Sequence, residues 1–197
     1  MSFRLGLTGS IGMGKSTTAA MFAEAGCAVW DADAAVHRLY AQGGAAVAPM
    51  AAAFPAAIEE GAVSRNRLKD IIAADASALT RIEKIVHPLL AEDRAAFAAN
   101  AEAEILVYDI PLMFETGGEK RMDAVACVSV SPELQQKRVM DRGTMSLAQF
   151  EAIRAKQMPN DEKCARSDYV IITDTLEHAR AQVEDIVTDV KRRMRDA

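Results

Sequence analysis

The sequence predicts an α/β protein in which a parallel sheet is covered by helices on both faces. Short apolar runs typical of strands alternate with longer segments of helical pattern, and this alternation implies right-handed crossovers between parallel strands. The chain has 197 residues, of which 50% are hydrophobic and 26% are charged, as is usual for one globular domain. A chain of this length can bury a sizeable core without disulfides or metal.

Composition and charge exclude several classes of protein. The net charge of −5 gives no overall basic field that would attract nucleic acid or an anionic membrane. Cys27, Cys127 and Cys164 form no CxxC pair, which favours reduced thiols over a zinc site or a disulfide framework. Two prolines interrupt the apolar stretch 45–58, and the first residues lack a signal-peptide core. We therefore expect a cytoplasmic monomer or weak homo-oligomer that binds neither nucleic acid nor membrane.

The first 40 residues predict two strand–helix units. The apolar run at 3–8 is bounded by glycine and predicts a buried strand, and a glycine-rich turn connects it to a helix at 16–25. The apolar run at 28–30 predicts a second strand. That strand ends at Asp31 and Asp33, where a second helix begins and continues to about residue 40.

Residues 45 to about 100 carry mainly helical patterns. Apolar residues recur at helical spacing on two faces, one formed by Leu68, Ile71 and Ile72 and the other by Leu79, Ile82, Ile85 and Val86. This stretch is too long for a simple crossover between two strands. We therefore expect it to form an inserted helical cap.

The C-terminal half returns to alternating strands and helices. The expected strands occupy residues 104–110, 124–130 and 169–172. Prolines end the first two strands, and a Gly-Thr pair at 143–144 separates the first two helices that follow. The expected helices occupy residues 132–142, 147–157 and 176–193.

The strongest functional signal is the glycine-rich segment 9–16, GSIGMGKS, which fits G-x-x-x-x-G-K-[S/T] between a strand and a helix. Its glycines allow several N–H groups to turn inward and form an anion nest at a helix N-terminus. Lys15 would reach the β- and γ-phosphates, and the Ser16 hydroxyl would coordinate Mg²⁺. The segment predicts binding of a nucleoside triphosphate, whereas the alternative, a turn without a ligand, leaves the lysine unexplained.

Asp31 and Asp33 are the next candidates. They follow the second strand at the carboxyl edge of the sheet, where open α/β folds bind their ligands. A carboxylate there can accept the proton of a substrate hydroxyl or hold Mg²⁺ through water. The alternative is an N-cap role, since aspartate caps helices well. Beside a phosphate-binding loop, we favour catalysis by Asp33.

Taken together, the motifs resemble the dephospho-coenzyme A kinase family over nearly the whole chain. They are LGLTGSIGMGKST at 5–17, WDADAAVHRLY at 30–40, Arg65 to Leu68, His87-Pro88, IPLMFE at 110–115, Arg138, Arg142 and Gln157, and SDYVI at 167–171. Met113 replaces a usual leucine, which conserves volume. Residues 172–175, Ile-Thr-Asp-Thr, lack the asparagine or glycine-rich turn that many members carry beside the adenine.

The resemblance implies a P-loop kinase-like sheet flanked by helices, with an acceptor-binding cap and a small lid. The expected reaction is phosphorylation of the ribose 3′-hydroxyl of dephospho-coenzyme A by ATP with Mg²⁺. We expect a single domain whose core covers about 1–42, 103–140 and 160–197. The helical acceptor-binding insertion covers about 43–102, and the lid covers about 138–159.

The resemblance also implies roles for individual residues. The catalytic residues are Asp33, Lys15 and Arg142. The residues expected to bind ATP are Gly9, Gly12, Met13, Gly14, Lys15, Ser16, Thr17 and Arg138, and the metal ligand is Ser16. The residues expected to bind the acceptor are Asp33, Arg65, His87, Pro111, Leu112 and Glu115.

Some of these residues could instead have a purely structural role. Arg138 and Arg142 lie one helical turn apart and could simply form a solvated charged face. His87, followed by proline, could begin a helix and have a structural role. Asp109, at the end of a predicted strand, is a weaker candidate for a second Mg²⁺ carboxylate.

Other functions compete with this prediction. Another nucleotide or metabolite kinase could share the scaffold, because neither the fold nor the loop fixes the acceptor. A regulatory GTPase should contain a guanine-reading N-K-x-D segment, yet Asn66, Asn100 and Asn160 begin none. A kinase acting on dephospho-coenzyme A is therefore the function we predict.

Overall fold

The computed structural model describes residues 2–196 and divides into two compact units. The sheet unit comprises the chain up to Trp30 and from Ala101 onward, and the helical unit comprises Asp31–Asn100. We predicted an insertion over 43–102, but the helical unit begins earlier. The reason is that Leu39 and Tyr40, from the helix after the second strand, belong to its hydrophobic core.

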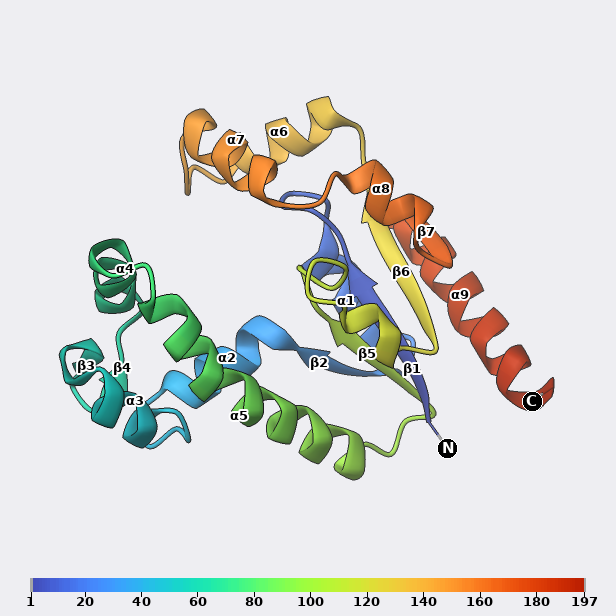
Figure 1. Cartoon of the computed structure of the whole chain (residues 1–197). Helices are drawn as coiled ribbons and strands as arrows, with labels where there is room; N and C mark the ends of the chain where they lie inside the picture. Colours follow the sequence, from blue (N-terminus) through green and yellow to red (C-terminus); the bar gives the residue numbers. More distant parts are fainter. Residues whose placement is uncertain (1, 197) are drawn as a thin grey trace. The chain divides into compact units, whose positions relative to one another are not determined.

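The sheet unit is built on five strands in the order β2-β5-β1-β6-β7 (Figure 1). They are β1 (Phe3–Thr8), β2 (Ala28–Asp31), β5 (Ile105–Asp109), β6 (Ala124–Ser129) and β7 (Tyr169–Ile172). β1 pairs in parallel with β5 and β6, and β6 pairs in parallel with β7. All five strands were predicted from their apolar runs. Parallel strands carry such continuous runs because both of their faces are buried.

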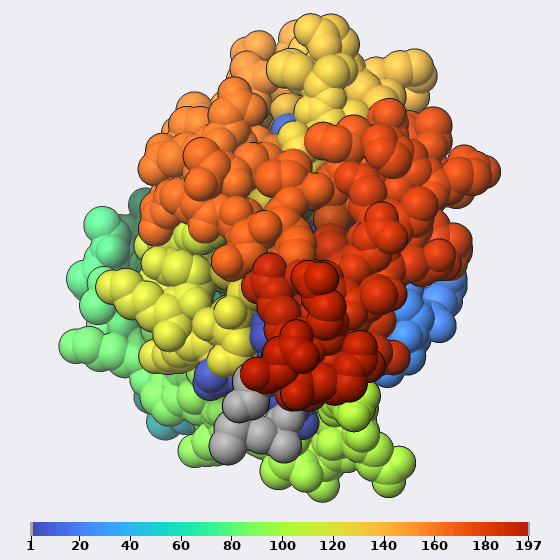
Figure 2. Space-filling view, turned by 90° about the vertical axis from the view of Figure 1, so that its right-hand side faces the viewer, coloured from blue at the N-terminus to red at the C-terminus, as the bar shows by residue number. Residues whose placement is uncertain are grey.

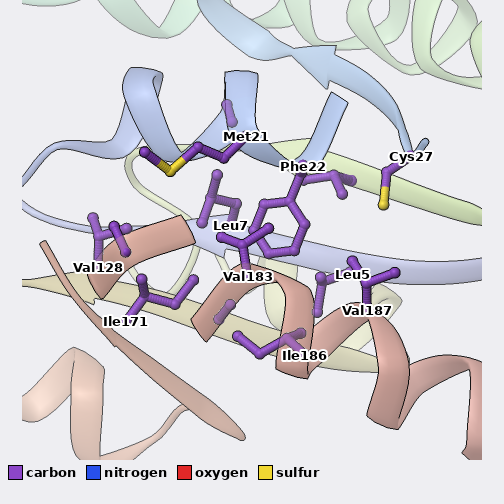
Figure 3. Packing of buried hydrophobic residues seen from close by; sticks show 14 of the residues in the cluster. Leu5, Leu7, Met21, Phe22, Cys27, Val128, Ile171, Val183, Ile186 and Val187 are labelled. Atoms are coloured by element: carbon purple, nitrogen blue, oxygen red, sulfur yellow. The ribbon is translucent and has the colours of Figure 1, made fainter. Parts of the chain in front are cut away.

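Helices cover both faces of this sheet. The main contacts with its strands come from α1 (Lys15–Glu24), α8 (Asn160–Ala165) and α9 (Leu176–Asp196). The unit also contains α6 (Pro132–Asp141) and α7 (Leu147–Lys156), which contact each other, and a short 3₁₀ helix at Gly118–Arg121. On one face, Phe22 of α1 and Val183 of α9 pack around Leu5 and Leu7 of β1 (Figure 3). Figure 2 shows the outer side of α9 at the surface of this unit.

The other face of the sheet has its own small core. Val125 of β6 packs there with Met113 and Phe114 from the segment after β5. Helix α8, which we did not predict, also lies against β6. Its six residues are too few to show a helical period in the sequence.

The helical unit contains α2 (Ala32–Tyr40), α3 (Val47–Ala53), a 3₁₀ turn (Pro55–Ala57), β3 (Ile58–Glu59), β4 (Ala62–Val63), α4 (Arg65–Ala74) and α5 (Ala78–Asn100). The prediction of a mainly helical insertion is confirmed, but it missed the β3–β4 hairpin. Glu60 and Gly61 turn this hairpin with positive φ angles of 50° and 78°, as tight hairpin turns require. Strands of two residues are too short to alternate visibly in sequence.

His87 does not begin a helix, so that alternative was wrong. It lies inside α5, exposed, and Pro88 follows it within the same helix. A proline removes one backbone hydrogen bond from a helix interior. Here Val86 before the proline and Leu89 after it share the same hydrophobic core, and this burial keeps the helix continuous.

The three cysteines are free thiols, as predicted. Burial raises the pKa of the Cys27 thiol to about 11, so this side chain is an inert part of the core. Within residues 2–196, no helix has both the length and the apolar character that a membrane span needs.

Candidate active site

The glycine-rich loop connects the end of β1 to the first turn of α1. Gly12 and Gly14 have φ angles of 78° and 93°, in the left-handed region that favours glycine. A Cβ at Gly12 would lie 2.6 Å from Val139 Cγ2, and one at Gly14 would lie 3.0 Å from Thr173 Oγ1. Both positions therefore require glycine for conformation and for space.

The loop leads directly into the N-terminus of α1. The Thr18 N–H donates to Gly14 O at 3.1 Å and so makes an early hydrogen bond of α1. The N–H groups of the residues just before Thr18 precede the helical ladder, and groups in this position bind anions. These N–H groups are the ones that the predicted phosphate-binding nest would use.

Lys15 is held by a carboxylate that the prediction had assigned only weakly. Its ammonium group forms an ion pair with Asp109 Oδ1, at the end of β5. The Asp109 side chain is fully buried, and 15% of the Lys15 side chain is exposed. Since β1 and β5 are parallel neighbours, their carboxyl ends meet at the same edge of the sheet. This brings residues 15 and 109 together.

The oxygen groups at this edge suit a hard cation. The Ser16 side chain is exposed in the first turn of α1, next to the Lys15–Asp109 pair. Within residues 2–196, no group of three or more His, Cys, Asp and Glu residues could hold a metal alone. Mg²⁺ binds proteins through few side chains, completing its shell with substrate phosphates and water. An exposed hydroxyl at the start of α1, directly after Lys15, is compatible with that way of binding.

Arg138 and Arg142 lie at different depths on α6. Arg138 donates to Thr173 Oγ1 at 3.1 Å, and Thr173 Oγ1 in turn donates to Met13 O at 2.7 Å. Thr173 therefore links α6 to the phosphate loop. Arg142 caps the end of α6 and is exposed. Helices α6 and α7 lie side by side (Figure 1).

The segment after β5 is anchored by a buried lysine. Lys163 of α8 is fully buried and donates to Pro111 O at 3.0 Å, while Thr8 Oγ1 donates to the same carbonyl at 3.1 Å. Lys163 also pairs with Glu115 Oε1 at 2.9 Å, which accepts a further hydrogen bond from the Met158 N–H. The network ties the segment that contains the predicted acceptor residues to the sheet and to α8.

Two of these predicted acceptor residues differ in availability. The Leu112 side chain is free to meet a ligand, since the residue is 43% exposed. The Glu115 carboxylate is already paired. Burial raises its pKa, but the hydrogen bonds from Lys163 and the Met158 N–H outweigh that effect and hold the pKa below its usual range.

In the helical unit, the two aspartates have separate positions. Asp31 is the N-cap of α2, and its Oδ1 accepts from the Ala34 N–H at 2.9 Å. Asp33 lies in the first turn of the helix and is exposed. The capping role therefore belongs to Asp31, and the Asp33 carboxylate does not cap α2.

Arg65 and His87 are also exposed side chains of the helical unit. Arg65 begins α4 directly after the N-cap Ser64. Its neighbour Arg67 is used internally, because it pairs with Glu59 at 3.1 Å. Arg65 and His87 thus remain candidates for binding an acceptor.

Comparison with known proteins identifies relatives of this chain. The family model described as dephospho-CoA kinase matches residues 3–178. A dephospho-CoA kinase from Ruegeria pomeroyi is 73% identical over 191 residues, which are 97% of each chain. A crystal structure from Thermus thermophilus aligns with a TM-score of 0.86 at 29% identity, covering 95% of this chain and 97% of that one. A dephospho-CoA kinase structure from Campylobacter jejuni, with a TM-score of 0.67 at 23% identity over 98% of both chains, supports the fold.

The Lys163–Glu115 pair leads to a prediction about stability. Glu115→Gln leaves a fully buried ammonium without its partner, so we expect a loss of about 2 kcal/mol, less than for a fully buried pair because the Glu115 side chain is 20% exposed. Thermal unfolding at pH 7 measures the difference. The control is Glu24→Gln, which breaks an exposed pair with Arg180 and should cost well under about 1 kcal/mol.

The same pair should depend on pH. A carboxyl whose folded pKa is lowered stabilises the protein above its unfolded pKa, and this contribution is lost as the pH falls through the folded pKa. The difference between wild type and Glu115→Gln should therefore be full near pH 7 and shrink below about pH 4. A difference that is independent of pH would show that Glu115 acts through packing and not through its charge.

Proposed function

This chain belongs to the dephospho-CoA kinase family, and on that premise we propose which residues carry out its reaction. The reaction moves the γ-phosphoryl group of ATP to the ribose 3′-hydroxyl of dephospho-CoA, giving CoA and ADP in the last step of CoA biosynthesis. The observation that carries the proposal is the phosphate loop, with Lys15 held at the N-terminus of α1 by the buried Asp109.

Lys15 and the loop bind the triphosphate. An ammonium group has three N–H donors, so Lys15 can keep its contact with Asp109 while it donates to β- and γ-phosphate oxygens. The fixed lysine then stabilises the charge that shifts toward the leaving oxygen during transfer. Mg²⁺ is part of the proposal, held by the Ser16 hydroxyl together with phosphate oxygens. When bound, it neutralises charge on the β- and γ-phosphates.

Asp33 is the proposed base. It follows the strand β2 and its carboxylate is exposed and is not the helix cap, so it can accept the proton of the 3′-hydroxyl. Arg65 and His87, also exposed in the helical unit, are the proposed partners of the anionic acceptor. Leu112 offers it an apolar contact. Glu115, paired with Lys163, contributes by holding the segment after β5 in place.

The two arginines of α6 complete the proposal. Arg142, exposed at the end of the helix, delivers its guanidinium group to the transferred phosphoryl group, and Arg138 supports ATP through the Thr173 contact. A planar guanidinium binds phosphate oxygens in pairs. We further propose that the chain acts in the cytoplasm, as a monomer or weak homo-oligomer, on small molecules alone.

Lys15→Ala should lower kcat by at least about 100-fold, because it removes a preorganised ammonium group that stabilises the charge on the transferred phosphoryl group. A coupled assay for ADP release from ATP and dephospho-CoA measures the effect. The matched control is Lys137→Ala, since Lys137 is an exposed lysine of α6 paired with Asp141, and it should keep wild-type kcat. Wild-type turnover by a folded Lys15→Ala protein would contradict the proposed site.

Asp33→Asn keeps the size of the side chain and removes the base. We expect kcat to fall by about 10²-fold, the lower part of the range for a general base, because phosphoryl transfer needs little early proton removal. The Kd for ATP, measured by titration with Mg²⁺, should change much less. If the ATP·Mg²⁺ affinity collapses while metal-free ATP still binds, Asp33 supports the metal. The exposed Asp70 of α4 provides the control substitution Asp70→Asn.

Arg142→Ala should lower kcat strongly while the Kd for ATP stays within a few-fold. Arg142→Lys should restore only part of the activity, because an ammonium group cannot bind two phosphate oxygens in a fixed plane. Arg192→Ala, on the exposed side of α9, controls for the loss of one surface charge. An effect confined to the ATP Kd, or no effect, would show that Arg142 is only part of a solvated charged surface.

A further inference from the structure

Two glutamines hold both sides of one peptide segment in the phosphate loop. Gln135 of α6 donates from Nε2 to Ile11 O at 2.7 Å. Gln157, the residue that caps the end of α7, accepts from the Ile11 N–H at Oε1, at 3.1 Å. The segment between these two glutamines contains the predicted lid helix, α7. Residues on both sides of α7 therefore meet on the same loop residue.

A third amide fixes the neighbouring residue to the sheet. Asn160 Oδ1 accepts from the Ser10 N–H at 3.0 Å, and Asn160 Nδ2 donates to Val128 O at 3.3 Å and to Ser129 Oγ at 3.2 Å. The N–H groups of Ser10 and Ile11 are thus satisfied by side-chain oxygens of the segment after α7. They are not among the groups that turn toward a phosphate.

The contact with α6 is close as well as polar. Gln135 is only 3% exposed, and a hydrogen bond away from water is stronger than one in solvent. At Gly12, a Cβ would lie 2.6 Å from Val139 Cγ2 and 3.1 Å from Gln135 O. The loop has no side chain at Gly12 to keep α6 away, so a shift of α6 transmits directly to the loop backbone.

We propose that Gln135 and Gln157 are positioning residues that form one clamp on the Ile11 backbone and set the shape of the phosphate loop. Neither residue is proposed to touch ATP, and the inference rests on the proposed role of the loop in binding it. The clamp holds the backbone at Ile11, in the part of the loop that follows β1, so that the N–H groups at the start of α1 face the phosphates. Because its two members flank α7, the same contacts couple the lid segment to nucleotide binding.

The test uses methionine, which keeps the length of glutamine but loses its polar atoms. In Gln135→Met and Gln157→Met, kcat/KM for ATP should fall by about 5- to 10-fold, the fold-change expected for loss of one hydrogen bond. KM for dephospho-CoA should stay within twofold. Gln136→Met, the exposed neighbour on α6, should match the wild type in both parameters.

The double variant separates a clamp from two independent contacts. If both glutamines hold the same loop shape, Gln135→Met with Gln157→Met should lose little more than either single variant, because coupled sites are not additive. Losses that multiply, or single variants with wild-type kcat/KM for ATP, would overturn the proposal. A change in melting temperature with unchanged ATP kinetics would also overturn it, since a merely structural role predicts that result.

Hydrogen exchange of the ligand-free protein tests the contact without activity. The Ile11 N–H should exchange faster in Gln157→Met and remain protected in Gln157→Glu, because a carboxylate oxygen still accepts its hydrogen bond. Equal protection in both variants would overturn the clamp. The wild-type enzyme, titrated with ATP and assayed for turnover in parallel, tests the proposed function separately. If it neither binds nor uses ATP, the fault lies with that function.

Discussion

A loop can present N–H groups to a phosphate only if its remaining backbone groups find partners elsewhere. An unsatisfied backbone group away from water is costly. Residues 10–13 of this loop lie between β1 and α1, outside both elements, so their backbone groups need other partners. Four backbone groups are satisfied by side chains: Ser10 N by Asn160, Ile11 N by Gln157, Ile11 O by Gln135, and Met13 O by Thr173. These contacts connect the loop to α6, the end of α7, α8 and the segment after β7.

The short helix α8 also depends on contacts made by side chains. Six residues are far below the length at which a helix is stable alone, so its position depends on tertiary contacts. Lys163 supplies them by binding Pro111 O and Glu115 in the segment after β5. With α8 fixed, Asn160 at its start reaches the phosphate loop. A buried ion pair on one side of the sheet thereby stabilises the shape of a loop at its edge.

Local sequence patterns predicted most of the fold and the centre of the site, but not the partners. The five strands and the long helices show in the sequence because burial imposes continuous or helical apolar patterns on them. The β3–β4 hairpin and α8 are too short to carry a period. The motif predicted Lys15, whereas its pairing with Asp109 depends on which strands are neighbours. Lys163 and Gln135 gave no signal, because only the folded chain shows that these polar side chains are buried.

The charge balance of the chain shows why affinity for a phosphate depends more on the shape of the loop than on the electrostatic field of the whole protein. The protein carries a net charge of −5, and Asp109 offsets the one lysine of the loop, so long-range attraction for a polyanion is weak. Charges more than about 8 Å apart are in any case largely screened at physiological salt. Backbone dipoles act at contact distance, where no ions intervene, and their effect depends on orientation. Affinity for a phosphate therefore depends on how accurately the N–H groups are aimed, and that aim is set by the side chains that hold the loop from behind.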